Sequence, residues 1–132
     1  MTPGQSRDDL KALAIRYIES VGQNRLDVVA DMLHPGLQFD GNFGPVAAQG
    51  PQGWLGALRR LSPILQKNEV RKVVVQGSEV CILYDFVTPI CPVPSVEWLT
   101  FDADKISSIY LLFDRSRWPE VLQELQRRQK AE

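Results

Sequence analysis

Two side chains in the stretch RYIESVGQNRLDVVADMLHPGLQFD could take part in acid–base chemistry, and a third lies much further along the chain. Tyr17 supplies a phenol, Asp40 a carboxyl group and Glu97 a second carboxyl group. Moving a proton next to a carbonyl group requires a base near the carbon and hydrogen-bond donors at the oxygen, where negative charge develops. These residue types meet both needs if the fold brings them into one cavity.

The phenol is expected to point into the protein interior. Apolar residues recur at helical spacing over residues 7–21, and Tyr17 lies within that apolar stripe. A buried phenol needs a hydrogen-bond partner inside the protein. The same spacing predicts a second helix from Leu26 to Leu33, which His34-Pro35-Gly36 would end.

A short strand is predicted from Leu37 to Asp40. Side chains alternate along a strand, so Leu37 and Phe39 share one face while Gln38 and Asp40 share the other. The carboxyl group of Asp40 therefore faces either water or a cavity. The glycine-rich segment GNFGPVAAQG follows, and it is expected to be either a lid or an ordinary surface loop.

The remaining elements are a third helix, four strands and a last helix. Gly50-Pro51 opens the third helix, and the last one begins near Asp114 or Ser116. Between them the period changes from helical to alternating. The expected strands are Val70–Gln76, Glu79–Val87, Ser95–Phe101 and Ile106–Phe113. This order predicts an α+β protein in which helices pack on a curved, mainly antiparallel sheet.

One face of this sheet would form the wall of an apolar pocket. Alternation places Glu97 on the same face as apolar residues of its own and the next strand, so its carboxyl group would lose hydration. Loss of hydration raises the pKa of a carboxyl group and favours its protonated form. The expected pocket residues are Trp54, Leu58, Ile82, Tyr84, Phe86, Leu99, Ile109, Leu111 and Phe113.

The other face of the sheet is expected to form a homodimer interface. It would expose a set of large apolar side chains, namely Leu83, Val87, Trp98, Tyr110 and Leu112. Exposed apolar patches of this size usually mark interfaces.

Composition and charge exclude several classes of protein. The 132 residues are expected to form a single domain, and the net charge of -1 without a broad basic stripe argues against nucleic-acid binding. No secretory signal and no membrane-spanning run are apparent, so a cytoplasmic location is expected. Cys81 and Cys91 fit no metal-binding spacing; two reduced thiols are expected, with a disulfide as the alternative. Neither a metal nor a cofactor is expected.

The helix, hairpin and strand pattern resembles the nuclear transport factor two-like superfamily, also called SnoaL-like, and within it the ketosteroid isomerases. The similarity extends over residues 7–126 and implies a cone-shaped fold. The stretch RYIESVGQNRLDVVADMLHPGLQFD resembles the isomerase segment that carries an oxyanion-hole tyrosine, here Tyr17, and a catalytic aspartate, here Asp40. The segment VEWLTF is similar to the strand that holds a protonated aspartic acid, where this chain has Glu97.

This resemblance implies a cofactor-free isomerase or cyclase that acts on an apolar carbonyl compound. Asp40 would shuttle the proton, and Tyr17 and a neutral Glu97 would donate hydrogen bonds to the enolate, as in ketosteroid isomerase. A SnoaL-like polyketide cyclase, which needs one acid–base carboxylate, is the alternative enzyme. A non-catalytic pocket for a hydrophobic ligand, or an accessory dimeric domain, is the alternative outside catalysis.

Each of the three residues also has a purely structural interpretation. Tyr17 would then be a core tyrosine whose hydroxyl meets a backbone carbonyl. Asp40 would be an aspartate at a strand end that faces water, and Glu97 an edge-strand charge paired with a surface cation. The only histidine, His34, fits a helix end better than a catalytic role.

Overall fold

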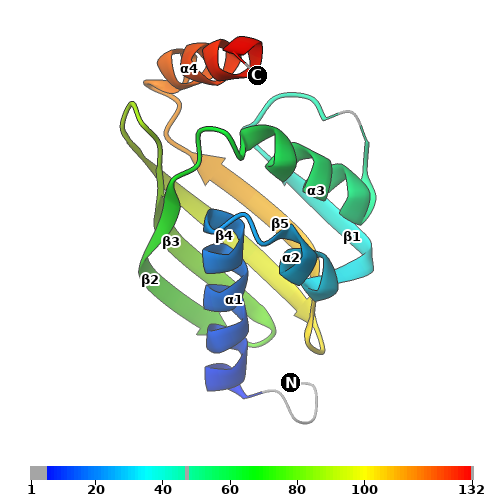
Figure 1. Cartoon of the computed structure of the whole chain (residues 1–132). Coiled ribbons are helices and arrows are strands. Elements are labelled where there is room, and N and C mark those ends of the chain that lie inside the picture. The colour runs from blue at the N-terminus through cyan, green and yellow to red at the C-terminus, as the bar shows by residue number, and fades with distance from the viewer. Residues whose placement is uncertain (1–5, 47, 132) are drawn as a thin grey trace.

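The computed structural model describes residues 6–46 and 48–131 (Figure 1). Four helices and five strands follow one another along the chain. They are α1 (Arg7–Gly22), α2 (Leu26–Met32), β1 (Leu33–Gly41), α3 (Gly50–Leu61), β2 (Lys67–Gln76), β3 (Glu79–Val87), β4 (Pro92–Asp102), β5 (Lys105–Phe113) and α4 (Trp118–Ala131). The predicted α+β class is confirmed.

The five strands form one curved sheet in the order β1-β5-β4-β3-β2. Strands β2 to β5 form an antiparallel meander, whereas β1 pairs in parallel with β5. Helices α1, α2 and α3 lie over the concave face of the sheet, and α4 lies near the end where β5 finishes (Figure 1). The side chains of the candidate site, described below, project from these elements into the space between the helices and the sheet.

Helix α1 starts at a capping box and ends in close contact with the sheet. The Ser6 hydroxyl accepts a hydrogen bond from the Asp9 backbone N–H at 3.0 Å, and the Asp9 carboxylate accepts one from the Ser6 N–H at 3.1 Å. At the other end, a Cβ on Gly22 would lie 2.5 Å from the Asn68 backbone nitrogen. Only glycine allows this approach, which fixes the position of α1 over the sheet.

Several predicted boundaries were wrong. Helix α2 ends at Met32, one residue earlier than predicted. His34-Pro35-Gly36 belongs to β1, where the register between β1 and β5 is irregular between Leu33 and Gln38. Strand β2 begins at Lys67 and β4 at Pro92, both earlier than predicted. Prolines are tolerated in β4 because they fall at one end of the strand, opposite the end of β3.

The predicted division of the sheet into two faces is correct. Val80, Ile82, Tyr84 and Phe86 are buried on the concave face, as is Glu97 on β4. The outer face exposes Val74, Leu83, Trp98, Tyr110 and Leu112, of which Trp98 is 45% and Tyr110 47% exposed. Val87, expected on this exposed patch, is half-buried. Among the described residues, no helix has the length and apolar character needed to span a membrane.

Candidate functional site

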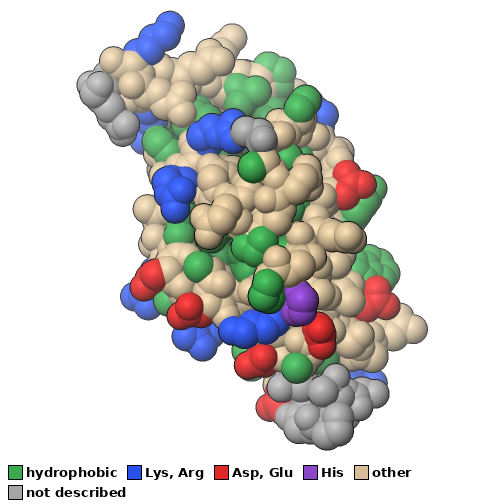
Figure 2. Space-filling model, turned by 90° about the vertical axis from the view of Figure 1, so that its right-hand side faces the viewer, with side chains coloured by type: hydrophobic (Ala, Val, Ile, Leu, Met, Phe, Trp, Pro, Cys, Tyr) green, Lys and Arg blue, Asp and Glu red, His purple; other side chains and the backbone are tan. Residues whose placement is uncertain are grey.

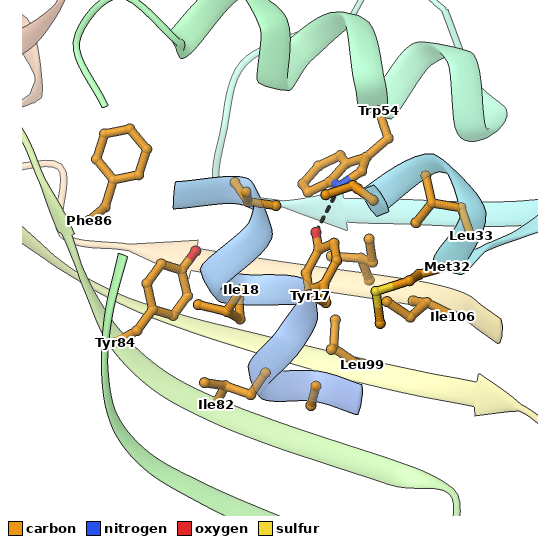
Figure 3. Close-up of a cluster of buried hydrophobic side chains, with 14 of the residues drawn as sticks. Tyr17, Ile18, Met32, Leu33, Trp54, Ile82, Tyr84, Phe86, Leu99 and Ile106 are labelled. Carbon is orange, nitrogen blue, oxygen red and sulfur yellow. Dashed lines mark hydrogen bonds between the residues drawn. The ribbon is translucent and has the colours of Figure 1, made fainter. Parts of the chain in front are cut away.

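A buried hydrogen-bond network joins four side chains from four different elements. The Tyr17 hydroxyl of α1 donates to Glu97 Oε1 of β4 at 3.1 Å, and the Tyr84 hydroxyl of β3 donates to Glu97 Oε2 at 2.5 Å. The Trp54 indole N–H of α3 donates to the Tyr17 hydroxyl oxygen at 2.8 Å (Figure 3). We call these four residues, Tyr17, Trp54, Tyr84 and Glu97, the Glu97 network.

Burial determines the protonation behaviour of the network. Glu97 is 4% exposed, and loss of hydration raises the pKa of its carboxyl group to about 7, although the hydrogen bonds from Tyr84 and Tyr17 lower it. Burial, and next the negative charge of Glu97, hold the pKa of each tyrosine well above its usual value. The carboxyl group is therefore the member that exchanges a proton near neutral pH.

The sheet register positions these groups. Glu97 lies opposite Ile82 on β3, and Tyr84, two residues along β3, lies opposite Ser95. Side chains two residues apart point to the same face of a strand, so Tyr84 and Glu97 both face the helices. Tyr17 reaches them because it lies on the buried face of α1. The predicted inward positions of Tyr17 and Glu97 are therefore correct.

A cavity of about 270 Å³ adjoins the network. Its wall combines α3, α4, the sheet and the segment from Phe43 to Val46, and it is mainly apolar. Of the nine predicted pocket residues, six line this cavity, namely Trp54, Leu58, Tyr84, Phe86, Leu111 and Phe113. The other three, Ile82, Leu99 and Ile109, are fully buried and do not line it, because the core filled by α1 occupies that part of the concave face.

Asp40 does not join the network, contrary to the expectation that it shares a cavity with Tyr17 and Glu97. Its side chain is exposed, and its Oδ1 accepts a hydrogen bond from the Gly41 N–H at 2.8 Å. Its partner in the β5 register is Tyr110, on the exposed outer face. The neighbouring Phe39 turns inward instead and packs against Trp54, with ring centroids 5.1 Å apart. An aromatic ring is buried at lower cost than a carboxyl group, so this strand turns Phe39 inward and Asp40 outward.

Sequence reasoning missed two features of the site. Tyr84 and Trp54 were expected only as pocket walls, but both also belong to the Glu97 network. The cavity wall also includes Ser95 and Arg60, which no motif indicated. The alternation of β3 and β4 was a usable signal for Tyr84, because it put the phenol and the carboxyl group on one face of adjacent strands.

His34 and the acidic residues in the described part of the chain are not arranged as a metal centre. His34 Nδ1 accepts a hydrogen bond from the Gly36 N–H, and its Nε2 lies 3.3 Å from Asp102 Oδ2 at the surface. Within residues 6–46 and 48–131, no group of three or more His, Cys, Asp or Glu side chains is arranged to hold a metal ion.

Comparison with known proteins identifies the fold alone. No protein-family model matches the sequence, and no curated protein matches it. Among solved structures, a de novo designed protein with a curved β-sheet has a TM-score of 0.77 at 19% identity, covering 93% of this chain and 98% of its own. An NTF2-like protein of unknown function from Cytophaga hutchinsonii has a TM-score of 0.68 at 18% identity, covering 87% and 96%.

A candidate SnoaL-like polyketide cyclase from Shewanella denitrificans is also similar. Its TM-score is 0.70 at 16% identity, covering 87% of this chain and 97% of the cyclase. The predicted cone-shaped fold is therefore confirmed. Because a designed protein has the same fold, the fold does not determine the chemistry, which must come from the side chains of the site.

Proposed function

We propose that this chain, whose fold is that of the NTF2-like and SnoaL-like superfamily, is a cofactor-independent enzyme that transfers a proton on an apolar carbonyl compound. Glu97 is the acid–base group, and Tyr84 is the member of its network that contacts the ligand. One observation carries the proposal: a buried carboxyl group with a pKa of about 7 is hydrogen-bonded to a tyrosine that lines an apolar cavity.

The proton would move in two linked steps. In its carboxylate form, Glu97 takes the hydroxyl proton of Tyr84 while the Tyr84 oxygen takes a proton from the carbon next to the ligand carbonyl. No tyrosinate accumulates, because the pKa of Tyr84 is held well above its usual value. The reverse transfer returns the proton to another position of the enolate. A carboxyl group with a pKa near the working pH suits both directions.

The positions of Glu97 and Asp40 favour a mechanism with one carboxyl group over the two-carboxyl arrangement of ketosteroid isomerase. Asp40 is exposed and pairs in register with Tyr110 of the outer face, which favours a base other than Asp40. SnoaL-like polyketide cyclases need one acid–base carboxylate, and the similarity to a candidate cyclase of this kind supports a one-carboxyl mechanism at the level of the fold. Cyclisation or isomerisation through an enolate would both use the same proton transfer.

Deuterium exchange tests the proposal without knowledge of the natural substrate. The protein is incubated in D2O with one-ring and two-ring ketones, and deuterium next to the carbonyl is measured by mass spectrometry. We expect exchange above the buffer rate, and Glu97→Gln should lower it about a hundredfold because the acid–base group is lost. Asp40→Asn is the matched control and should leave the rate unchanged. Exchange that persists in Glu97→Gln contradicts the proposal.

Binding without conversion is the second candidate function. It is favoured by one observation, namely that Glu97 itself does not line the cavity, whose wall is mainly apolar. A ketone that raises the melting temperature of the protein but gains no deuterium would support this alternative.

We further propose that two copies of the chain associate through the outer face of the sheet. The exposed apolar side chains there would be covered in such a dimer. In sedimentation experiments we expect a dimer for the native protein and a monomer for Leu112→Arg, because a charge at the centre of an apolar interface loses its hydration. Gln126→Arg, at an exposed position of α4, should leave the dimer intact. A native protein that sediments as a monomer contradicts this prediction.

A further inference from the structure

One charged side chain contributes to the wall of the cavity. Among the described residues that line it, Arg60 alone carries a charge, while Tyr84 and Ser95 supply hydroxyl groups and nearly all the others are apolar. Tyr84 and Ser95 are cross-strand partners, so their polar groups lie together on the sheet side. The cavity therefore has polar groups on its sheet side and on α3.

The two sets of polar groups differ in their access to solvent, because Tyr84 is buried and Arg60 is exposed. Trp54 is buried and is bonded to Tyr17, so it marks the inner end near the Glu97 network. Arg60 lines the cavity and is also exposed to solvent, so it marks the opening. The two residues are six positions apart on α3, which corresponds to about 9 Å along a helix.

Arg60 has no acidic partner among the described residues, whereas four other arginines of the chain have one. Arg71 pairs with Asp85, Arg117 with Glu120, and Arg127 and Arg128 with Glu124. On the face shown in Figure 2, Lys and Arg side chains occur in both the upper and the lower part, whereas acidic side chains lie mainly in the lower part. Arg60 therefore contributes a positive charge to the cavity wall that no acidic side chain of the described residues neutralises.

We propose that the ligand of this cavity is an apolar carboxylate, with its anionic group at Arg60 and an oxygen function at the Glu97 network. This inference rests on the proposed function, because it assumes that the cavity binds the substrate. A guanidinium group at the edge of an apolar cavity pairs well with a carboxylate, which it can hold by two parallel hydrogen bonds.

Binding of 6-hydroxy-2-naphthoate tests the inference, because this fluorescent molecule carries a hydroxyl group and a carboxylate at opposite ends of two fused rings. Its neutral counterpart is 6-hydroxy-2-naphthamide. We expect the native protein to bind the carboxylate about fivefold more tightly than the amide, as for a partly exposed ion pair. This preference should weaken as the salt concentration rises.

Arg60→Gln should abolish the preference by weakening carboxylate binding while leaving amide binding unchanged. The matched control is Arg59→Gln, since Arg59 is the adjacent exposed arginine of α3 and does not line the cavity. Equal binding of the two probes by the native protein, or a preference that survives in Arg60→Gln, overturns the inference but leaves the proposed function standing. Failure of both probes and of neutral 2-naphthol to bind would overturn the ligand-binding cavity itself, and the inference with it.

Discussion

Native protein unfolded with urea should be less stable at pH 8 than at pH 5, and Glu97→Gln should remove most of this difference. The carboxyl group of Glu97 has a pKa of about 7 in the folded protein, against 4.5 for an ordinary glutamate. Between these two values the unfolded chain has released a proton that the folded protein still holds. The free energy of unfolding therefore falls as the pH rises through this window, by about 3 kcal/mol in total.

The comparison between native protein and Glu97→Gln isolates this effect from other groups. Arg127 and Arg128 lower the pKa of Glu124 to about 2, so that carboxylate is already charged throughout the range from pH 5 to pH 8. Urea unfolding at pH 5, 6, 7 and 8 gives the stability of both proteins. The difference in their free energies of unfolding should change by about 3 kcal/mol across the range in favour of the glutamine variant. Parallel profiles would show that Glu97 titrates normally.

Replacement of Tyr17 by phenylalanine should destabilise the protein by about 2 to 4 kcal/mol, because two buried polar groups each lose a partner. The Trp54 indole N–H loses its acceptor, and Glu97 Oε1 loses a donor. The loss should be larger at pH 8 than at pH 5, since a charged carboxylate depends more on its donors than a neutral one. Urea unfolding of the variant at both pH values measures this effect.

Tyr110→Phe provides the matched control for this prediction. Tyr110 has the same side chain but is 47% exposed on the outer face of the sheet, so loss of its hydroxyl should change stability by less than about 0.5 kcal/mol. A Tyr17→Phe variant as stable as Tyr110→Phe would show that the Glu97 network contributes little to folding. In that case the short contacts around Glu97 would not reflect strong hydrogen bonds.

Periodicity predicted the elements and the sheet faces because burial repeats along the chain. The helical spacing around Tyr17 and the alternation around Glu97 each reflect one buried side, so both groups were correctly placed inside the protein. The raised pKa of Glu97 followed from the same reasoning, since a carboxyl group on an apolar face loses hydration. These conclusions needed only local patterns.

The position of Asp40 was wrong because a strand pattern gives alternation but does not say which face is inner. The interior is filled by Phe39, which contacts Trp54, and this leaves Asp40 outside. The hydrogen bond between Glu97 and Tyr17 could not be predicted from spacing either, since Tyr17 lies 80 residues away in the sequence. Such contacts depend on strand register and on the angle of α1, which no local motif specifies.

The three tryptophans lie in three different environments, so their fluorescence can report on separate parts of the molecule. Trp54 is buried within the Glu97 network, Trp118 lines the cavity, and Trp98 is exposed on the outer sheet face. Indole emission depends on the polarity around the ring. Variants that keep one tryptophan at a time would therefore follow carboxyl titration, ligand entry and subunit pairing as separate optical signals, without any attached dye.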